Sequence, residues 1–139
     1  MPRIPQTGSW EERLAQVRSW DLHPFWHLLG VEVVGLGPAS SRLHVALDPV
    51  KHGAWPHGGL LSSLVDMAVA MALFTTYGPE DDDVTAHATA DLNVTFLDAV
   101  EGADLFAEGR IVRRARAVAG RLIALGRATF LIRREPPGG

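Results

Sequence analysis

The pattern of hydrophobic and polar positions predicts a helix, two strands, a long apolar helix and then only strands. A capping box, Ser9 with Glu12 three residues later, begins a short first helix that runs to about Ser19. Other segments are typical of strands, several with the period of two that a half-buried strand requires. The expected strands are Val31–Leu36, Arg42–Leu47, Thr85–Leu97, Leu105–Val112 and the stretch Ala117–Ile132. This order indicates an α+β fold, an antiparallel sheet packed against one central helix.

The central helix is expected to run from Gly58 or Gly59 to about Thr76, and it is apolar on nearly all sides. Such a helix is wrapped by a sheet or by a partner subunit. Asp66 is its only charged residue. Burying an unpaired carboxylate costs on the order of several kcal/mol or shifts its pKa strongly. A chain that keeps a carboxylate at this position is therefore expected to use it.

Length and composition favour one domain in a cytoplasmic enzyme or binding protein. The chain has 139 residues, enough for a single core, and we expect one domain over residues 1–139 with flexible tails at 1–8 and 133–139. Its net charge of −3 predicts no strong attraction to nucleic acid. The longest apolar run, Leu64–Phe74, is too short to span a bilayer, and no signal peptide is recognised.

The types of residue also limit the chemistry. The chain has no cysteine, which excludes disulfides, thiolate metal sites and a cysteine nucleophile. No cluster of histidines and carboxylates has the spacing of a catalytic metal site, so we expect no metal and no cofactor.

The segment before the central helix suggests a site for a polarised carbonyl group. His57–Gly59 places a glycine pair at the helix start, where backbone N–H groups can come close to a ligand. Ser62 and Ser63 share a helix face with Asp66, which gives a small, polar stripe with room for a ligand or a partner helix. His57 itself is expected to shape the turn as a capping residue, with a role in substrate binding as the alternative.

These residues resemble the signature of hotdog-fold acyl-CoA thioesterases of the phenylacetate-pathway (PaaI-like) type. That signature is His-Gly-Gly followed at a fixed distance by Leu-x-Asp-x-Ala, matched here by His57–Leu60 and Leu64–Ala68. Thr89–Leu97 and Leu122–Phe130 are similar to the family's central and last strands. The resemblance covers about residues 25–132. It implies the hotdog fold, with five or six strands around the helix because the segment before the last strand is shorter than usual.

The resemblance also implies a reaction, the hydrolysis of an acyl-CoA thioester to a free acid and CoA. Gly58 would donate its backbone N–H to the thioester carbonyl oxygen. Asp66 would be the general base for water, or a nucleophile that forms a transient anhydride, and Thr89 would position the water. In this family Gly58 and Asp66 are expected from one subunit and Thr89 from the other. The site would then lie at a homodimer interface, and many members pair their dimers into homotetramers.

One departure from the family pattern concerns the position six residues before His57, which the family usually fills with Asn. Lys51 stands there, followed by His52. His52 is the candidate to take over the role of the Asn, holding the thioester or the water; the alternative is a solvated loop histidine. Trp55 is expected either to line the acyl pocket or only to pack.

The remaining candidates complete the expected site. Arg113 and Arg114 belong to a tight arginine cluster that either contacts a phosphorylated ligand tail or is solvated. The expected substrate-binding set is His57, Gly59, Ser62, Ser63, Trp55, Arg113 and Arg114. The histidines His44 and His87 lie on expected strands and are assigned to the surface or the core. Strict alternation in the Thr85–Leu97 strand separates two faces, Leu92, Val94 and Phe96 against Asp91, Asn93 and Thr95.

Two alternative functions remain open. One is a non-catalytic acyl-CoA-binding hotdog protein, which the substitution at the Asn position favours. The other is a hotdog hydratase or dehydratase. Those enzymes usually need a catalytic histidine paired with an acid in sequence contexts that this chain lacks.

Overall fold

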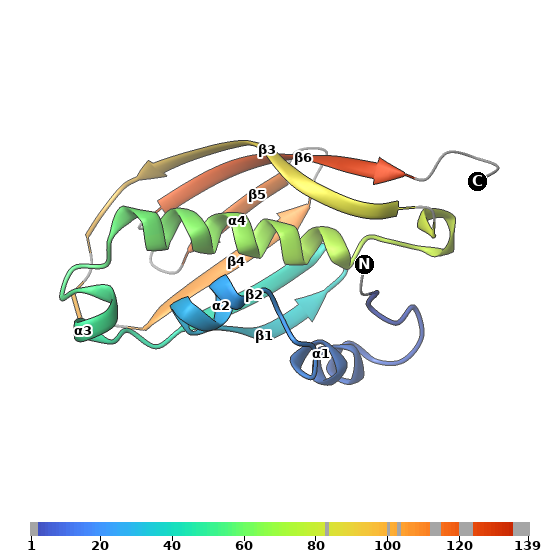
Figure 1. Ribbon diagram of the computed structural model, residues 1–139, viewed down its shortest axis with the longest axis horizontal. Coiled ribbons are helices and arrows are strands. Elements are labelled where there is room, and N and C mark those ends of the chain that lie inside the picture. The colour runs from blue at the N-terminus through green and yellow to red at the C-terminus, as the bar shows by residue number, and fades with distance from the viewer. Residues whose placement is uncertain are drawn as a thin grey trace.

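The computed structural model describes residues 3–82, 84–99, 101–102, 104–111, 115–119 and 124–134. One long helix lies in the concave face of a curved antiparallel sheet (Figure 1). The helices are α1 Trp10–Arg18, α2 Pro24–Leu29, α3 Pro49–His52, α4 Gly58–Phe74 and the short 3-10 helix η1 Pro79–Asp81. The strands are β1 Val31–Gly37, β2 Ser40–Val45, β3 Val84–Phe96, β4 Leu105–Ile111, β5 Ala115–Ala119 and β6 Ala124–Arg134.

The sheet has six strands in the order β1-β2-β4-β5-β6-β3, and every neighbouring pair is antiparallel. This confirms the expected α+β architecture. The stretch expected as one or two strands after Ile111 forms two, β5 and β6. The edges of the described sheet are β1 and β3. Within the described residues, no helix has both the length and the apolar character needed to cross a membrane.

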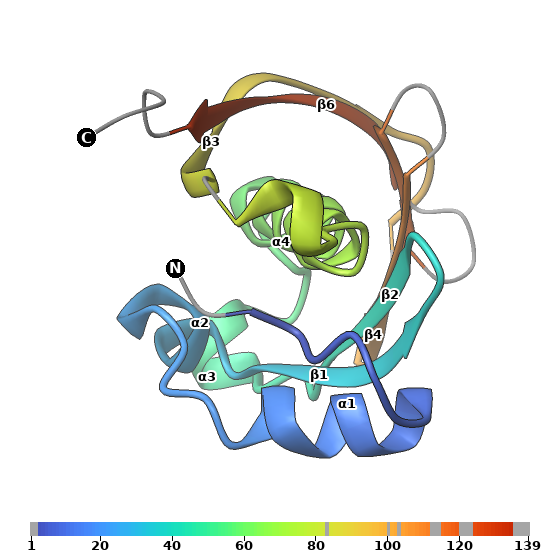
Figure 2. The same cartoon turned by 90° about the vertical axis from the view of Figure 1, so that its right-hand side faces the viewer.

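Helix α4 begins where His57 caps it and ends at Phe74, slightly before the expected end. Figure 2 shows it enclosed on most sides by the curved sheet. Its buried side chains are Leu60, Leu61, Leu64, Val65, Met67, Ala68, Val69, Met71 and Ala72. A stripe of small and polar residues stays at least partly accessible: Gly59, Ser62, Ser63, Asp66 and Ala70. We call this stripe the open face of α4.

The backbone of α4 comes very close to the middle of the sheet. Ser41 Oγ donates a hydrogen bond of 2.7 Å to the carbonyl oxygen of Ala68, and Gly109 pairs with Ser41 across β2 and β4. A Cβ atom added at Gly109 would lie 2.1 Å from the same carbonyl oxygen. The small Ser41–Gly109 pair is therefore what allows the helix to sit this deep in the sheet.

Residues 3–8 correct the expectation of a flexible tail at residues 1–8, of which residues 1 and 2 lie outside the described chain. Ile4 is only 3% exposed and belongs to the hydrophobic core. Arg3 donates to the carbonyl oxygens of Asp81 and Val84, and Gln6 donates to that of Tyr77. We call residues 3–8 the strap, because they cross the end of α4 and hold the segment that leads into β3 (Figure 2). At the other end, β6 runs to Arg134, and the rest of the expected tail lies outside the described residues.

The close approach at Gly109 predicts that Gly109→Ala lowers the free energy of unfolding by about 3 kcal/mol, because the new methyl group overlaps a backbone carbonyl that no rotamer change can move. Urea denaturation measures this loss. Gly102→Ala is the matched control: Gly102 has φ +60°, and a Cβ atom added there would meet nothing within 4 Å, so this change costs only backbone strain of about 1 kcal/mol. A loss at Gly109 no larger than that at Gly102 would contradict this packing.

Candidate functional site

Asp66 and Thr89 form a hydrogen-bonded pair within one chain. Thr89 Oγ1 donates to Asp66 Oδ1 at a distance of 2.6 Å. Asp66 is half-buried on the open face of α4, and Thr89 is exposed on β3. The expectation that Thr89 reaches Asp66 from another subunit is therefore wrong, because β3 passes beside α4 of its own chain. The pair joins a carboxylate to a hydroxyl on a face that solvent can reach.

Two bulges in β3 explain why Thr89 faces α4. The register of β3 against β6 shifts between Val84 and Ala86 and again between Thr89 and Asp91. Each extra residue reverses which side chains face the helix. Val94 packs on the core after the second bulge, whereas strict alternation through Thr89 would have put it on the opposite face from Thr89. The bulges thus bring polar and apolar side chains of one strand to the same face.

His87 precedes Thr89 by two residues and lies on the same side of β3. Its Nδ1 is 3.1 Å from the hydroxyl of Tyr77, and its ring centroid is 4.7 Å from that of Phe74. Burial lowers the pKa of His87 below its ordinary value of 6.5, and the nearby charge of Asp66 opposes this by raising the pKa. The sequence assigned His87 to the surface or the core. The structure places it beside the Asp66–Thr89 pair, and its spacing from Thr89 was the signal that could have shown this.

The first turn of α4 leaves one backbone amide available. His57 Nδ1 accepts a hydrogen bond of 2.8 Å from the Gly59 N–H, as a capping residue does. The N–H groups of Leu60 and Leu61 bond to the carbonyl oxygen of His57. Within the described part of the chain, the N–H of Gly58 has no such partner. The helix start can therefore offer the Gly58 amide to a ligand oxygen, and His57 shapes the turn that presents it.

An apolar pocket of about 170 Å³ lies beside Gly58. Its walls are Trp55, Pro56, Gly58, Leu61, Phe96, Asp98 and Ala99. The ring of Phe96 covers Gly58 so closely that a Cβ atom added there would be 3.2 Å from Phe96 Cζ. Trp55 and Phe96 are 60% and 50% exposed, although both are large and apolar. The free N–H of Gly58 and the apolar walls of the pocket together suit a carbonyl group that carries a hydrocarbon substituent.

Comparison with known proteins agrees with this geometry. A family model described as the thioesterase superfamily matches residues 56–130, more than half of the 139-residue chain. The chain belongs to the thioesterase superfamily. A search of curated proteins finds no match.

Solved structures with the same fold include other members of this superfamily. A thioesterase family protein from Silicibacter pomeroyi superposes with a TM-score of 0.72 at 22% identity, covering 91% of this chain and 100% of the other. Zebra fish thioesterase superfamily member 2 gives 0.63 at 23% identity, covering 87% and 93%. A mutant of the phenylacetic acid degradation protein PaaI from Thermus thermophilus gives 0.59 at 24%, covering 80% and 99%. These likenesses confirm the hotdog fold.

In this thioesterase-superfamily chain, His52 does not match either expectation for it. It is buried, so it is no solvated loop residue. Its Nδ1 accepts from the N–H of Asp48 at 3.0 Å, and its Nε2 lies 3.0 Å from the carbonyl oxygen of Leu29. Nδ1 thus bonds to the residue that caps α3, and Nε2 fastens α3 to the end of α2. We therefore leave His52 out of the proposed catalytic group.

The remaining candidates are the two serines on the open face of α4 and the two arginines after β4. Ser63 Oγ donates to the carbonyl oxygen of Gly59 at 2.7 Å, so its hydroxyl is used within the helix. Ser62 is half-buried on the open face. Arg113 and Arg114 lie outside the described residues. Among those that are described, no group of three or more histidines and acids is placed to hold a metal ion.

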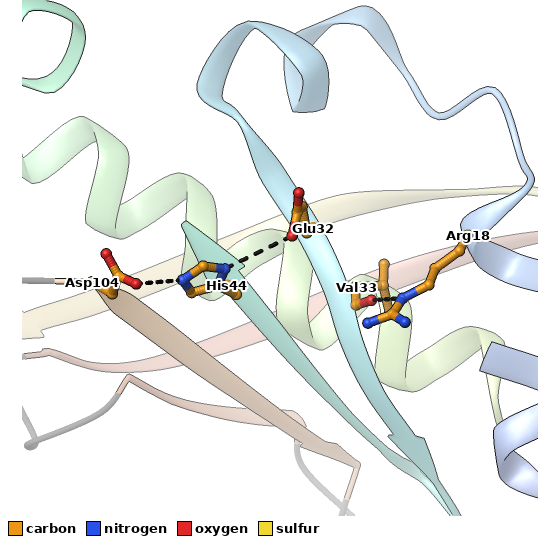
Figure 3. A network of polar contacts seen from close by, with 5 residues as sticks. All are labelled: Arg18, Glu32, Val33, His44 and Asp104. Carbon is orange, nitrogen blue, oxygen red and sulfur yellow. Dashed lines mark hydrogen bonds and ion pairs between the residues drawn. The ribbon is translucent and has the colours of Figure 1, made fainter. Parts of the chain in front are cut away.

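A separate polar network lies on the opposite face of the sheet from α4. His44 Nε2 is 2.9 Å from Asp104 Oδ2, and Nδ1 is 3.8 Å from Glu32 Oε2 (Figure 3). The neighbouring Arg18 donates to the carbonyl oxygen of Val33 at 2.9 Å. The network connects β1 and β2 to the start of β4, away from Asp66. His44 therefore lies on the outer face of the sheet, where it is only partly exposed, and the sequence had left its place open between the surface and the core.

The lowered pKa of His87 predicts a specific dependence of stability on pH. The folded state favours the neutral ring, so below pH 6.5 the unfolded state binds more protons at this residue. The contribution is complete above that pH and is lost as the pH falls through the folded pKa. We expect the free energy of unfolding to drop more steeply between about pH 7.5 and pH 5 in the wild type than in His87→Gln, as measured by urea denaturation. Parallel curves for the two proteins would refute this assignment.

Proposed function

We propose that this protein hydrolyses an acyl-CoA thioester to a free acid and CoA. Membership in the thioesterase superfamily supports thioester hydrolysis as the class of reaction. The observation that carries the proposal is the 2.6 Å bond from Thr89 to Asp66 on the open face of α4. The Gly58 amide beside an apolar pocket could bind the thioester carbonyl oxygen and the acyl group. We call the Asp66–Thr89 pair and the Gly58 amide with its pocket the two half-sites.

In the proposed reaction, Asp66 is ionised and removes a proton from a water molecule. Thr89 donates to Oδ1, which leaves Oδ2 for that water. The water oxygen attacks the thioester carbonyl carbon, and the negative charge that forms on the carbonyl oxygen is stabilised by the Gly58 N–H and the positive end of α4. Breakage of the carbon–sulfur bond releases CoA, whose sulfur takes the proton from Asp66. Direct attack by Asp66, through an anhydride that water then hydrolyses, is the alternative route with the same products.

One chain cannot supply both half-sites to one thioester. Gly58 and Asp66 are eight residues apart in the same helix, about 12 Å along its axis. A general base must reach the reacting atom directly or through one water molecule. The Gly58 amide that completes the site of Asp66 is therefore proposed to come from a second copy of the chain.

A symmetric dimer can meet this requirement. In an antiparallel pair of α4 helices, the Gly58 of one copy lies opposite the Asp66 of the other when the two-fold axis passes near Ser62, midway between them. Ser62 belongs to the open face, whose small side chains permit a close approach. Strand β3 is 13 residues long and forms an edge of the described sheet. It exposes Leu92 and Phe96, and Leu97, the residue after it, is also exposed. Such an edge is a ready template for pairing with another chain.

A non-catalytic acyl-CoA-binding protein is the second candidate. The observation that favours it lies at the position where the resemblance expects an Asn. Lys51 stands there, and the neighbouring His52 is held by backbone groups on both ring nitrogens. A side-chain amide for the thioester or the water is therefore missing at this position, and turnover has to be measured.

The role of Asp66 predicts that Asp66→Asn lowers kcat by about 10² to 10⁴-fold with a smaller effect on KM, because the amide cannot accept the proton of the water. Release of free thiol from short, medium, long and aromatic acyl-CoA esters measures this. Asp91→Asn is the control, an exposed acid on β3 beyond the second bulge. Near wild-type turnover by Asp66→Asn would remove it from the chemistry. Tight binding of every ester without thiol release by the wild type would favour the binding protein.

The role of Gly58 predicts that Gly58→Pro lowers kcat by about 10² to 10³-fold, because proline has no N–H to stabilise the oxyanion. The position tolerates proline: it is the first residue of a helix, and the preceding His57 has φ −62° and ψ 140°. Gly58→Ala is the control that adds the same Cβ against Phe96 but keeps the N–H. Equal losses in the two variants would show that the amide is not used.

The same variants test the sharing of the site between subunits. Gly58→Pro and Asp66→Asn chains, each inactive alone, are unfolded together and refolded as a mixture. If each site combines Gly58 of one subunit with Asp66 of the other, mixed dimers contain one intact site, and about a quarter of the wild-type activity returns. If both groups come from one chain, the mixture stays inactive.

A further inference from the structure

His87 is held from the side away from Thr89 by the end of α4 and the segment that follows it. Tyr77 is only 3% exposed, and its hydroxyl lies 3.1 Å from His87 Nδ1. The ring of Phe74 packs edge-on against both residues, with centroid distances of 4.7 Å to His87 and 6.1 Å to Tyr77. The imidazole ring is thus held by its polar contact with Tyr77 and by ring contacts with Phe74 and Tyr77.

Tyr77 is itself fixed by the strap. Gln6 Nε2 donates to the Tyr77 carbonyl oxygen, and the Arg3 guanidinium lies 5.2 Å from the centroid of the Tyr77 ring. Arg3 also donates to the carbonyl oxygens of Asp81 and Val84, on the way into β3. These contacts connect the N-terminal residues to His87 through Tyr77.

The backbone around His87 needs such support. A bulge leaves its extra residue unpaired and disrupts the ladder locally. Bulges flank the short segment that carries His87 and Thr89, one before Ala86 and one after Thr89. Between the bulges, Ala86–Thr89 stays in register with Phe130–Arg133 of β6, and its two inward-facing side chains add contacts on the side of α4. One is the bond from Thr89 to Asp66, and the other is the set of contacts made by His87.

Ionisable groups near His87 lie on α4, on the segment after it and in the strap. Asp66 faces it from α4, Tyr77 faces it from the following segment, and Arg3 lies behind Tyr77. On β6, the residues in register with His87 and Thr89 are Ile132 and Phe130, neither of which ionises. Because burial favours the neutral ring, His87 can hold the segment without placing a full positive charge beside Asp66.

We propose that His87, anchored by Tyr77, is a positioning residue that holds Thr89 in bonding distance of Asp66 and so keeps the second carboxylate oxygen directed at water. This inference rests on the proposed thioester hydrolysis. His87 does not touch the reacting atoms. It acts through Thr89, and Tyr77 acts through His87.

The kinetic test uses His87→Leu, Tyr77→Phe and the double variant. We expect His87→Leu to lower kcat about 10- to 100-fold, because a misplacement of about 1 Å is costly, with KM changed less than about twofold. Tyr77→Phe, which removes only the hydroxyl, should lower kcat about 3- to 10-fold, and the double variant should be no slower than His87→Leu alone, because the two changes break one chain of contacts. His87→Gln, which can still bond to Tyr77, should recover part of the activity.

The control is Ser41→Ala, which removes a buried hydroxyl bonded to the opposite side of α4. It should lower the unfolding midpoint while kcat stays at the wild-type value. The proposal is overturned if His87→Leu keeps wild-type kcat, if the Tyr77 and His87 effects multiply in the double variant, or if Ser41→Ala loses as much kcat as Tyr77→Phe.

A measurement without substrate separates this proposal from the reaction it rests on. Thr89→Val and Asp66→Ala should have non-additive effects on the free energy of unfolding in the wild type, because each removes one end of the same hydrogen bond. In the His87→Leu background this coupling should disappear. If no ester releases thiol but the coupling behaves in this way, the reaction is wrong and the positioning stands. If the coupling survives in His87→Leu, the positioning is wrong whatever the activity.

Discussion

The burial of α4 on every side but one is the constraint on which the rest of this structure depends. The helix is apolar around most of its circumference, and the Ser41–Gly109 pair lets its backbone approach the sheet closely at Ala68. A charged side chain can remain on such a helix only where the sheet does not cover it. Asp66 lies on that open face, and the half-burial of its carboxylate follows from how far the sheet curves around the helix.

Strand β3 completes the site beside Asp66, because a bulge changes which of its side chains face α4 along its length. An edge strand with regular alternation would present either its polar or its apolar side chains to α4. The bulge after Thr89 allows both: the hydroxyl bonds to Asp66, while Val94 packs on the core and Phe96 lies over Gly58. Bulges of this kind occur beside active sites because they re-aim a side chain at the cost of a disrupted ladder. In the proposed role of His87, its contacts help to offset that disruption.

Much of the fold, but less of the site, could be predicted from the sequence. The order of elements, the start of α4, the cap by His57 and the singular position of Asp66 follow from local patterns, because each depends on neighbours a few residues away. The side of β3 that carries Thr89 could not be predicted, since one extra residue reverses the alternation and leaves no mark in the pattern. His52 was misjudged for a similar reason: its partner, the carbonyl of Leu29, is 23 residues away. The strap looked flexible because two prolines and a glycine in residues 1–8 are typical of an unstructured segment, although Ile4 is buried.

The proposed division of the site between two copies follows from the geometry of a single helix. An oxyanion donor belongs at a helix start, where amides are free, whereas a carboxylate in the middle of the helix lies away from the carbonyl end that would disfavour its charge. Gly58 and Asp66 each occupy such a place, but the helix axis then keeps them apart. In the proposed dimer, an antiparallel copy brings the two together and also covers the open face. Asp66 would then lose much of its water, and the Thr89 hydroxyl would be in place to stabilise the ionised carboxylate that the reaction needs. In the proposed dimer, the pair within one chain would thus prepare the carboxylate for the burial that the second chain brings.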